Sequence, residues 1–318
     1  MAVKSEKIKL GTRGSPLALF QTRTVQAELA KRFPALETEI VVIKTSGDWS
    51  PADGEVRLLD AGGRKGQFSK EIEAALLEGR VDAAVHSMKD METDLPEGLV
   101  LPFMLPREDV RDAFLSNKAQ KLDDLPDGCV VGTASVRRAA FLLSKRPGLK
   151  VVPFRGNVQT RIDKMRTGQV DATFLACAGL NRLGLAHEIS SVLAPEEMMP
   201  ASGQGAVGIE VRAGDERVSS YISQISDFDT VICVTAERAV LATLDGSCHT
   251  PVGAYARLEG GEMWLRAQVV SPDGRQSFYE EGRRAVGDVA EAALFGDEIG
   301  CKLKQVVPQD ILSFFIQK

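Results

Sequence analysis

Two stretches of the sequence share a pattern, and this internal repeat constrains the fold more than any other feature. Gly-Arg-Val-Asp-Ala at residues 79–83 recurs as Gly-Gln-Val-Asp-Ala at residues 168–172, each time between a helical pattern and an apolar run. Gly-Thr at residues 11–12, with Ser15, matches Gly-Thr-Ala-Ser at residues 132–135. Repeated patterns of this kind indicate repeated structural units. They predict two α/β domains of similar build, with a cleft between them that can hold a ligand.

Polar residues crowd together after the first of these apolar runs. The run at residues 81–85 is typical of a strand covered on both faces. Ligands bind beyond the carboxyl ends of strands in open α/β sheets, and four polar residues stand there: His86, Ser87, Lys89 and Asp90. A carboxylate beside a cation and a hydroxyl favours proton transfer or charge stabilisation. The alternative is a solvated loop in which Asp90 only pairs with Lys89.

Arginines stand at predicted helix starts, where the helix dipole opposes a positive charge. Arg13 comes just before a helix predicted over residues 16–32, and Arg137 with Arg138 opens the helix after the second copy of the repeat. Between residues 132 and 182, ten Lys and Arg residues accompany only two Asp residues. Arginines so placed favour the capture of carboxylates or phosphates. A solvated basic face is the alternative.

The composition limits the classes of function. The chain has 318 residues, 44% of them hydrophobic, and its net charge of -5 argues against non-specific nucleic-acid binding. The first residues lack the apolar core of a signal peptide, and no run is long enough to span a bilayer. Five cysteines without a Cys-x-x-Cys pair indicate neither a disulfide framework nor a zinc site. We expect a cytoplasmic protein that binds neither nucleic acid nor a membrane.

Other segments predict strands, a lid and a return crossing. Strands are expected at residues 7–12 and 39–44. The Gly-, Asp- and Pro-rich stretch at residues 46–66 is long enough to be a lid or disordered. A glycine-rich turn at residues 200–206 is expected to return the chain to the first domain, with Gln204 facing the cleft.

The last part of the chain predicts a small α+β domain. We expect a strand at residues 231–234, a helix at 235–244, an antiparallel sheet, and a closing helix at 288–304. Between them, Cys248 lies in a loop among polar neighbours, where a thiol can be a nucleophile or an attachment point. It follows a helix C-terminus, whose dipole raises the pKa of a thiol, so a protease-type thiolate is not favoured.

The histidines do not supply an obvious partner for this thiol. His249 is adjacent to Cys248 and could serve as a base, but neighbouring side chains in a loop often diverge. His86, His187 and His249 show no metal-ligand spacing, so no metal site is expected.

Seven motifs in one order give the chain a specific resemblance. They are Thr-Arg-Gly-Ser-Pro-Leu-Ala-Leu (12–19), His-Ser-Met-Lys-Asp (86–90), Gly-Thr-Ala-Ser-Val-Arg-Arg (132–138), Arg-Gly-Asn-Val-Gln-Thr-Arg (155–161), Ala-Gly-Leu-Asn-Arg-Leu-Gly-Leu (178–185), Gly-Gln-Gly-Ala (203–206) and Gly-Ser-Cys (246–248). Together they closely resemble the porphobilinogen deaminase family, and the match covers nearly the whole chain.

The resemblance implies a fold and a reaction. The fold has two α/β domains like those of periplasmic binding proteins, with a central cleft, and a small C-terminal α+β domain. The implied bounds are 5–105 with 201–224, then 106–200, then 225–318. The implied enzyme is a cytoplasmic monomer that joins four porphobilinogen molecules head to tail and releases ammonia. It builds them on a dipyrromethane cofactor, bound by a thioether to Cys248, and frees hydroxymethylbilane by hydrolysis.

The resemblance also implies roles for single residues. Asp90 is the implied catalytic carboxylate, which holds pyrrole N–H groups and stabilises the cationic azafulvene-like intermediate. The implied cofactor-binding residues are Cys248, Ser87, Lys89, Asp90, Thr133, Ser135, Arg137, Arg138, Arg155 and Gly156. The implied substrate-binding residues are Arg13, Ser15, Lys65, Arg155, Arg161, Arg182 and Gln204. The lid motif departs from the family pattern, since Arg64 stands before Lys65 and Gln67 replaces an apolar residue.

Two other classes of function are consistent with parts of the sequence. A non-enzymatic anion-binding module of the periplasmic-binding type explains the repeat and the arginines, but not Cys248 or a third domain. A cysteine-dependent hydrolase explains Cys248 but lacks a convincing base.

Overall fold

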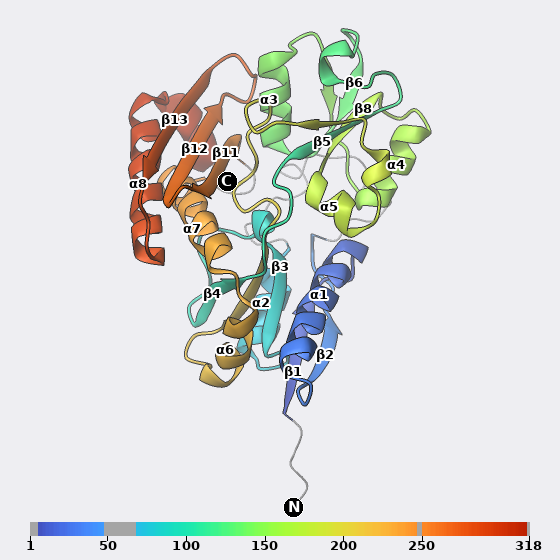
Figure 1. Cartoon of the computed structure of the whole chain (residues 1–318). Helices are drawn as coiled ribbons and strands as arrows, with labels where there is room; N and C mark the ends of the chain where they lie inside the picture. The colour runs from blue at the N-terminus through green and yellow to red at the C-terminus, as the bar shows by residue number, and fades with distance from the viewer. Residues whose placement is uncertain (1–5, 48–67, 247–249, 317–318) are drawn as a thin grey trace, which may run out of the picture.

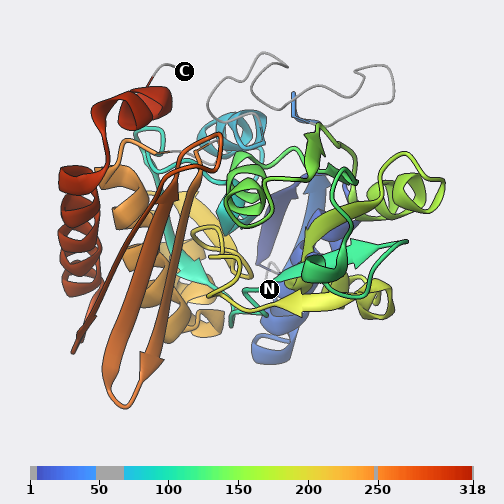
Figure 2. The same ribbon diagram turned by 90° about the horizontal axis from the view of Figure 1, so that it is seen from above.

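The computed structural model describes residues 6–47, 68–246 and 250–316 (Figure 1). These residues form two five-stranded mixed sheets and one three-stranded antiparallel sheet, all with helices packed against them. Viewed from above, the third sheet and its outer helix lie at one side of the molecule (Figure 2). The predicted architecture of two α/β units and a small α+β unit is confirmed.

The first sheet combines the amino-terminal strands with one strand from much later in the chain. Its order is β2 (Glu37–Val42), β1 (Lys7–Thr12), β3 (Ala83–Ser87), β10 (Val207–Arg212) and β4 (Leu99–Met104). The strand predicted at 7–12 is confirmed, and the one predicted at 39–44 lies two residues earlier. Helices α1 (Pro16–Arg32) and α6 (Glu216–Ile222) cover one face, and α2 (Lys70–Leu77) covers the other.

The second sheet has the same arrangement of strands. Its order is β7 (Lys150–Val152), β6 (Val130–Gly132), β8 (Ala172–Ala176), β5 (Asp112–Ser116) and β9 (Ser191–Leu193). In both sheets the first three strands in this order are parallel to one another. The third strand then pairs antiparallel with the fourth, and the fourth pairs antiparallel with the fifth. Its helices are α3 (Val136–Lys145), α4 (Val158–Arg166) and α5 (Cys177–Arg182).

The internal repeat has a structural counterpart at the level of single hydrogen bonds. The Asp82 carboxylate accepts from Lys9 N at 2.8 Å, and Asp82 N donates to Lys9 O. The Asp171 carboxylate accepts from Val130 N at 2.7 Å, and Asp171 N donates to Val130 O. Each aspartate therefore joins the start of one strand to its parallel neighbour, which explains why the motif occurs once in each unit.

The chain passes between the first two sheets twice. The first crossing segment, residues 105–111, joins β4 to β5, and the second, residues 194–206, joins β9 to β10. Glu108 N donates to Gly205 O at 3.2 Å, so the two segments touch. Gly205 has a φ of 88°, and a Cβ there would lie 2.3 Å from Glu108 O. Only glycine allows this approach, and β10 confirms the predicted return to the first sheet.

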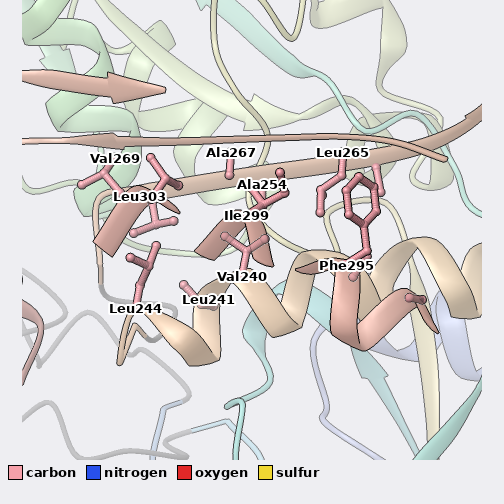
Figure 3. Packing of buried hydrophobic residues seen from close by; sticks show 14 of the residues in the cluster. Val240, Leu241, Leu244, Ala254, Leu265, Ala267, Val269, Phe295, Ile299 and Leu303 are labelled. Carbon is pink, nitrogen blue, oxygen red and sulfur yellow. The ribbon is translucent and has the colours of Figure 1, made fainter. Parts of the chain in front are cut away.

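The third unit packs one sheet against three helices. Its strands are β11 (Val252–Glu259), β12 (Glu262–Val270) and β13 (Ser277–Arg284), and its helices are α7 (Phe228–Thr243), α8 (Val289–Val306) and α9 (Gln309–Ile316). Figure 3 shows its core, in which Val240 of α7 and Phe295 and Ile299 of α8 meet Leu265 of β12. The predicted antiparallel sheet and closing helix are confirmed.

The strand predicted at residues 231–234 is wrong, because these residues belong to α7. Ile232 and Cys233 pack in the third unit, whereas Val231 and Val234 pack on the first unit beside Met88. When a helix is buried on opposite sides, its sequence is a continuous apolar run. Periodicity alone does not distinguish such a run from a buried strand.

Four 3-10 helices complete the described secondary structure. They are η2 (Met88–Asp90), η3 (Leu122–Asp124), η4 (Ala186–Glu188) and η5 (Ser223–Ile225). Within the described residues, none of the helices has both the length and the apolar character needed to cross a bilayer.

Candidate active site

Asp90 lies at the carboxyl end of β3, which points toward the second sheet (Figure 1). The buried Met88 side chain anchors the 3-10 turn between Met104 and Ala206. The Asp90 carboxylate is half-buried, and no hydrogen bond or ion pair joins it to another described residue. In particular, Asp90 does not pair with Lys89, as the solvated-loop alternative required.

Lys89 points instead to the second crossing segment. Its Nζ donates to Gln204 Oε1 at 3.5 Å. Burial, together with the nearby Arg138 and Arg137 guanidiniums, lowers the pKa of Lys89 to about 8, although the Asp90 and Asp112 carboxylates oppose the shift. An ammonium in this position is stabilised by an added anion.

Gln204 connects Lys89 to the second unit. The Gln204 side chain is completely buried. Its Nε2 donates to Val110 O at 2.6 Å and to Asp112 Oδ1 at 3.1 Å. The amide therefore bridges the end of β3, the first crossing segment and the start of β5.

Asp112 holds two arginines at the start of α3. Its carboxylate accepts from Arg137 Nη2 at 2.7 Å and from Arg138 Nη2 at 2.6 Å. Burial favours a raised Asp112 pKa, but the two guanidiniums outweigh burial and hold the pKa well below its usual range. Asp112 was not predicted from the sequence, although it directly precedes the apolar run at residues 113–115.

The two arginines also bind main-chain carbonyls. Arg137 Nη1 donates to Met199 O at 2.6 Å, and Arg138 Nη1 donates to Phe174 O at 2.8 Å. Ser135 caps their helix by accepting from Arg138 N at 3.3 Å. The guanidinium groups are thus fixed before any ligand arrives.

A cavity of about 410 Å³, counting the space open to solvent, lies where all three units meet. Its polar lining consists of Lys89, Ser135, Arg137, Ser202, Arg238 and Thr250. Ser202 and Arg238 were not predicted from the sequence. Thr250 follows Cys248 by two positions, so the cavity borders the segment that carries the predicted attachment point.

Two buried donors in this cavity have unused hydrogen-bonding capacity. Among the described residues, Arg137 Nε and Ser202 Oγ have no partner. Buried polar groups are normally paired, and a cationic donor pairs best with a carboxylate. Dipyrromethane carries carboxylate side chains, so the residues present fit this cofactor.

The other predicted residues on the first unit lie around the start of α1. Ser15 caps α1 and accepts from Ala18 N at 3.3 Å. The Arg13 guanidinium stacks over the Phe68 ring at 4.3 Å. Ser87 Oγ donates to Gln21 Oε1 at 3.1 Å.

His86 does not join the polar cluster that the sequence suggested. Its Nε2 lies 3.0 Å from Glu210 Oε2, and both side chains are buried in the first unit.

The predicted residues of the second unit divide into two groups. Thr133 Oγ1 accepts from Ser135 N at 3.1 Å and so belongs with the α3 start. Arg155 is buried just before α4, next to Gly156 with a φ of 120°, and Arg161 is half-buried within α4. These two arginines do not line the cavity described above.

Three further predicted site residues, Arg182, Lys65 and Cys248, lie away from the cavity or outside the described residues. Arg182 ends α5 and donates through Nη2 to Gly205 O at 2.7 Å, so it contacts the second crossing segment. Lys65 and Cys248 lie outside the described residues, as do Arg64 and His249.

Comparison with solved structures gives distant likenesses. A putative methionine-binding lipoprotein from Bacillus subtilis is 13% identical, with a TM-score of 0.43, over 71% of this chain and 92% of that one. An arginine-specific periplasmic binding protein from Salmonella typhimurium is 14% identical, with a TM-score of 0.41, over 69% and 91%. Likeness at this level carries no information about function.

Comparison with curated proteins gives much closer relatives. A porphobilinogen deaminase from Nitrobacter hamburgensis is 48% identical over 308 residues, which are 96% of this chain and 95% of that one. One from Paracoccus denitrificans is 47% identical over 313 residues, 96% of each. A chloroplastic one from Oryza sativa subsp. japonica is 48% identical over 95% of this chain and 84% of its own length.

Family models agree with these relatives. The model described as the dipyromethane cofactor binding domain of porphobilinogen deaminase matches residues 8–220, and that of the C-terminal domain matches residues 231–305. The resemblance seen in the seven motifs is confirmed, and with it the enzyme interpretation rather than the binding-module alternative. The chain belongs to the porphobilinogen deaminase family.

Proposed function

We propose that Asp90 is the catalytic carboxylate of this enzyme. The chain is a hydroxymethylbilane synthase of tetrapyrrole biosynthesis, and porphobilinogen is its substrate. The observation that carries the proposal is a half-buried carboxylate, unpaired among the described residues, beside a cavity lined by Lys89 and Arg137. An enzyme that removes ammonia from its substrate needs a fixed negative charge where positive charge develops.

Asp90 has two tasks in this proposal. Its carboxylate accepts hydrogen bonds from the pyrrole N–H of the substrate and so orients the reacting carbon. It also stabilises the positive charge that develops on the substrate as ammonia leaves, and it is available to take the proton that is lost after the new bond forms.

The cofactor site is proposed to be the cavity between the three units, with Cys248 as the attachment point. The bound dipyrromethane supplies the pyrrole end to which the substrate units are joined. Arg137 Nε and Ser202 Oγ are buried donors in this cavity and are suited to its carboxylates. Lys89 and Ser135 line the same cavity, and Ser87, Thr133, Arg138, Arg155 and Gly156 complete the proposed set.

Substrate carboxylates are proposed to bind outside this cavity. The proposed residues are Arg13, Ser15, Lys65, Arg155, Arg161, Arg182 and Gln204. The proposed domains are residues 5–105 with 201–224, residues 106–200, and residues 225–318, and each of the three sheets falls within one of them. We also propose a monomer that acts in the cytoplasm, as the resemblance implies, and light scattering of the purified protein tests the monomer.

Substitution of the carboxylate tests the role of Asp90. Asp90→Asn removes the negative charge but keeps the shape, and we expect kcat to fall about 100-fold or more. Asp288→Asn is a matched control, because Asp288 caps α8 through a 2.8 Å bond from Glu291 N and asparagine caps equally well. A kcat in Asp90→Asn as high as in Asp288→Asn would remove Asp90 from the mechanism.

Intact mass tests the attachment point independently of activity. The purified protein is expected to carry an excess mass of two pyrrole units, which Cys248→Ser removes. Cys301→Ser is the matched control, since Cys301 is an exposed thiol on α8. An excess mass that survives Cys248→Ser and disappears in Cys301→Ser would contradict the assignment.

A further inference from the structure

Arg238 makes an unusual contact between the third unit and the catalytic segment. It projects from α7, and its guanidinium donates to three consecutive carbonyls that follow Asp90. Nη1 donates to Met91 O at 3.3 Å, and Nη2 donates to Glu92 O at 2.5 Å and to Thr93 O at 3.4 Å. None of these carbonyls belongs to a helix or a strand, so the arginine takes the place of a regular backbone partner.

The contact depends on the shape of the arginine side chain. A guanidinium offers five N–H donors in a rigid plane, whereas a lysine offers one compact charge. Burial lowers the Arg238 pKa, and the Glu92, Asp94 and Glu210 carboxylates oppose that effect. The Arg238 guanidinium is therefore held between main-chain carbonyls and nearby carboxylates.

The neighbouring residue on α7 fixes the helix to both crossing segments. Glu237 Oε1 accepts from Arg107 Nη1 at 2.6 Å, and Glu237 Oε2 accepts from Gly203 N at 2.7 Å. Ala256 N of β11 also donates to Glu237 Oε1, at 2.7 Å. Helix α7, which carries Arg238, is thus bonded to the third sheet and to both crossing segments.

We infer that Arg238 is a positioning residue for the reaction, which holds the Asp90 carboxylate at a fixed place relative to the cavity. The inference rests on the proposed role of Asp90. Arg238 itself lines the cavity together with Lys89 and Thr250, so it joins the catalytic segment to the wall that contains Thr250, a residue two positions after Cys248 in the sequence. Without the guanidinium, residues 91–93 lose these three hydrogen bonds to α7, and we expect the preceding carboxylate to be held less firmly.

A second arginine provides a matched control. Arg146 ends α3 and donates through Nη1 to Leu122 O at 2.8 Å and through Nη2 to Leu125 O at 2.6 Å. It makes the same kind of carbonyl contact, but it does not line the cavity. Arg146→Met should therefore loosen residues 122–125 and leave turnover unchanged.

The experiment combines hydrogen exchange with kinetics on Arg238→Met, Arg238→Lys and Arg146→Met. In Arg238→Met we expect amide exchange at residues 91–95 to accelerate about tenfold or more. We expect kcat to fall about tenfold or more with KM nearly unchanged, because a misplaced catalytic group slows the chemical step. Arg238→Lys should lie between Arg238→Met and the wild type in both measurements, and it decides the question if Arg238→Met does not fold.

Three outcomes would overturn the inference. They are a wild-type kcat in the Arg238 variants, a rise in KM alone, and a loss of kcat without faster exchange at residues 91–95. The last two would mean that Arg238 contacts the ligand rather than positions Asp90. Wild-type turnover of Asp90→Asn would contradict the proposed function instead, whatever the Arg238 variants do.

Discussion

Asp112 neutralises only part of the positive charge beside the cavity. It binds both Arg137 and Arg138, so one carboxylate serves two guanidiniums, and Lys89 adds a third cation nearby. Arg137 Nε has no partner among the described residues. The remaining positive charge is suited to the carboxylates of a pyrrole cofactor, which become part of the charge balance only when the cofactor binds.

The charge of Lys89 makes cofactor loading depend on pH. Its pKa is lowered to about 8, so the protonated form is lost as pH rises through that value. The neutral amine does not attract a carboxylate, and we therefore expect the rate at which apoprotein is loaded to fall between about pH 7 and pH 9. Intact mass after mixing apoprotein with porphobilinogen measures the loaded fraction at each pH.

Lys89→Arg is the control for this pH dependence. Arginine stays charged across the whole range, so the loading rate of this variant should change less between pH 7 and pH 9 than that of the wild type. Equal pH profiles for the two proteins would contradict the assignment of the pH effect to Lys89.

At the scale of elements, local sequence patterns predicted several of the helices and strands, among them β1, β3, α1 and α8. Ser15 and Ser135 stand at the starts of two predicted helices, where serine favours capping, and both cap their helices. The repeat reflects a shared contact, because each of its aspartates lies just before a strand and bonds to the parallel neighbouring strand. Helix α7 was misassigned because it is buried against two units at once, and that information is not local.

Site residues could be predicted from the sequence only where they belong to motifs. Lys89, Asp90, Arg137 and Gln204 were found because they belong to recognisable motifs. Asp112 and Arg238 were missed because each gains its role from contacts far away in the sequence, and Ser202 was missed because only the fold places it in the cavity wall. Arg238, for example, meets a carbonyl 147 positions earlier in the chain.

At the scale of the whole molecule, Glu237 is the point at which the three units are joined. It is completely buried and pairs with Arg107, whose Nε also donates to Gln204 O at 2.9 Å. One carboxylate thereby links the third unit to both crossing segments. Because the cavity lies between the units, its shape depends on this joint.

Breaking the joint should destabilise the whole protein. Glu237→Gln leaves the Arg107 guanidinium buried without its counter-charge, and we expect the free energy of unfolding to fall by roughly 3–5 kcal/mol. Glu298→Gln is the matched control, because Glu298 pairs with Lys302 and Arg284 at the surface and its loss should cost about 1 kcal/mol or less. Urea unfolding of the two variants gives the comparison, and equal losses would contradict the assigned role of Glu237.

The most direct test of the account follows single additions to the enzyme by intact mass. Cofactor-loaded protein is mixed with porphobilinogen, and the mass is recorded over time for the wild type and for Asp90→Asn. We expect the wild type to gain pyrrole units one after another, while Asp90→Asn stays at the mass of the loaded protein. Stepwise gains in Asp90→Asn at the wild-type rate would contradict the claim that this carboxylate carries the chemistry.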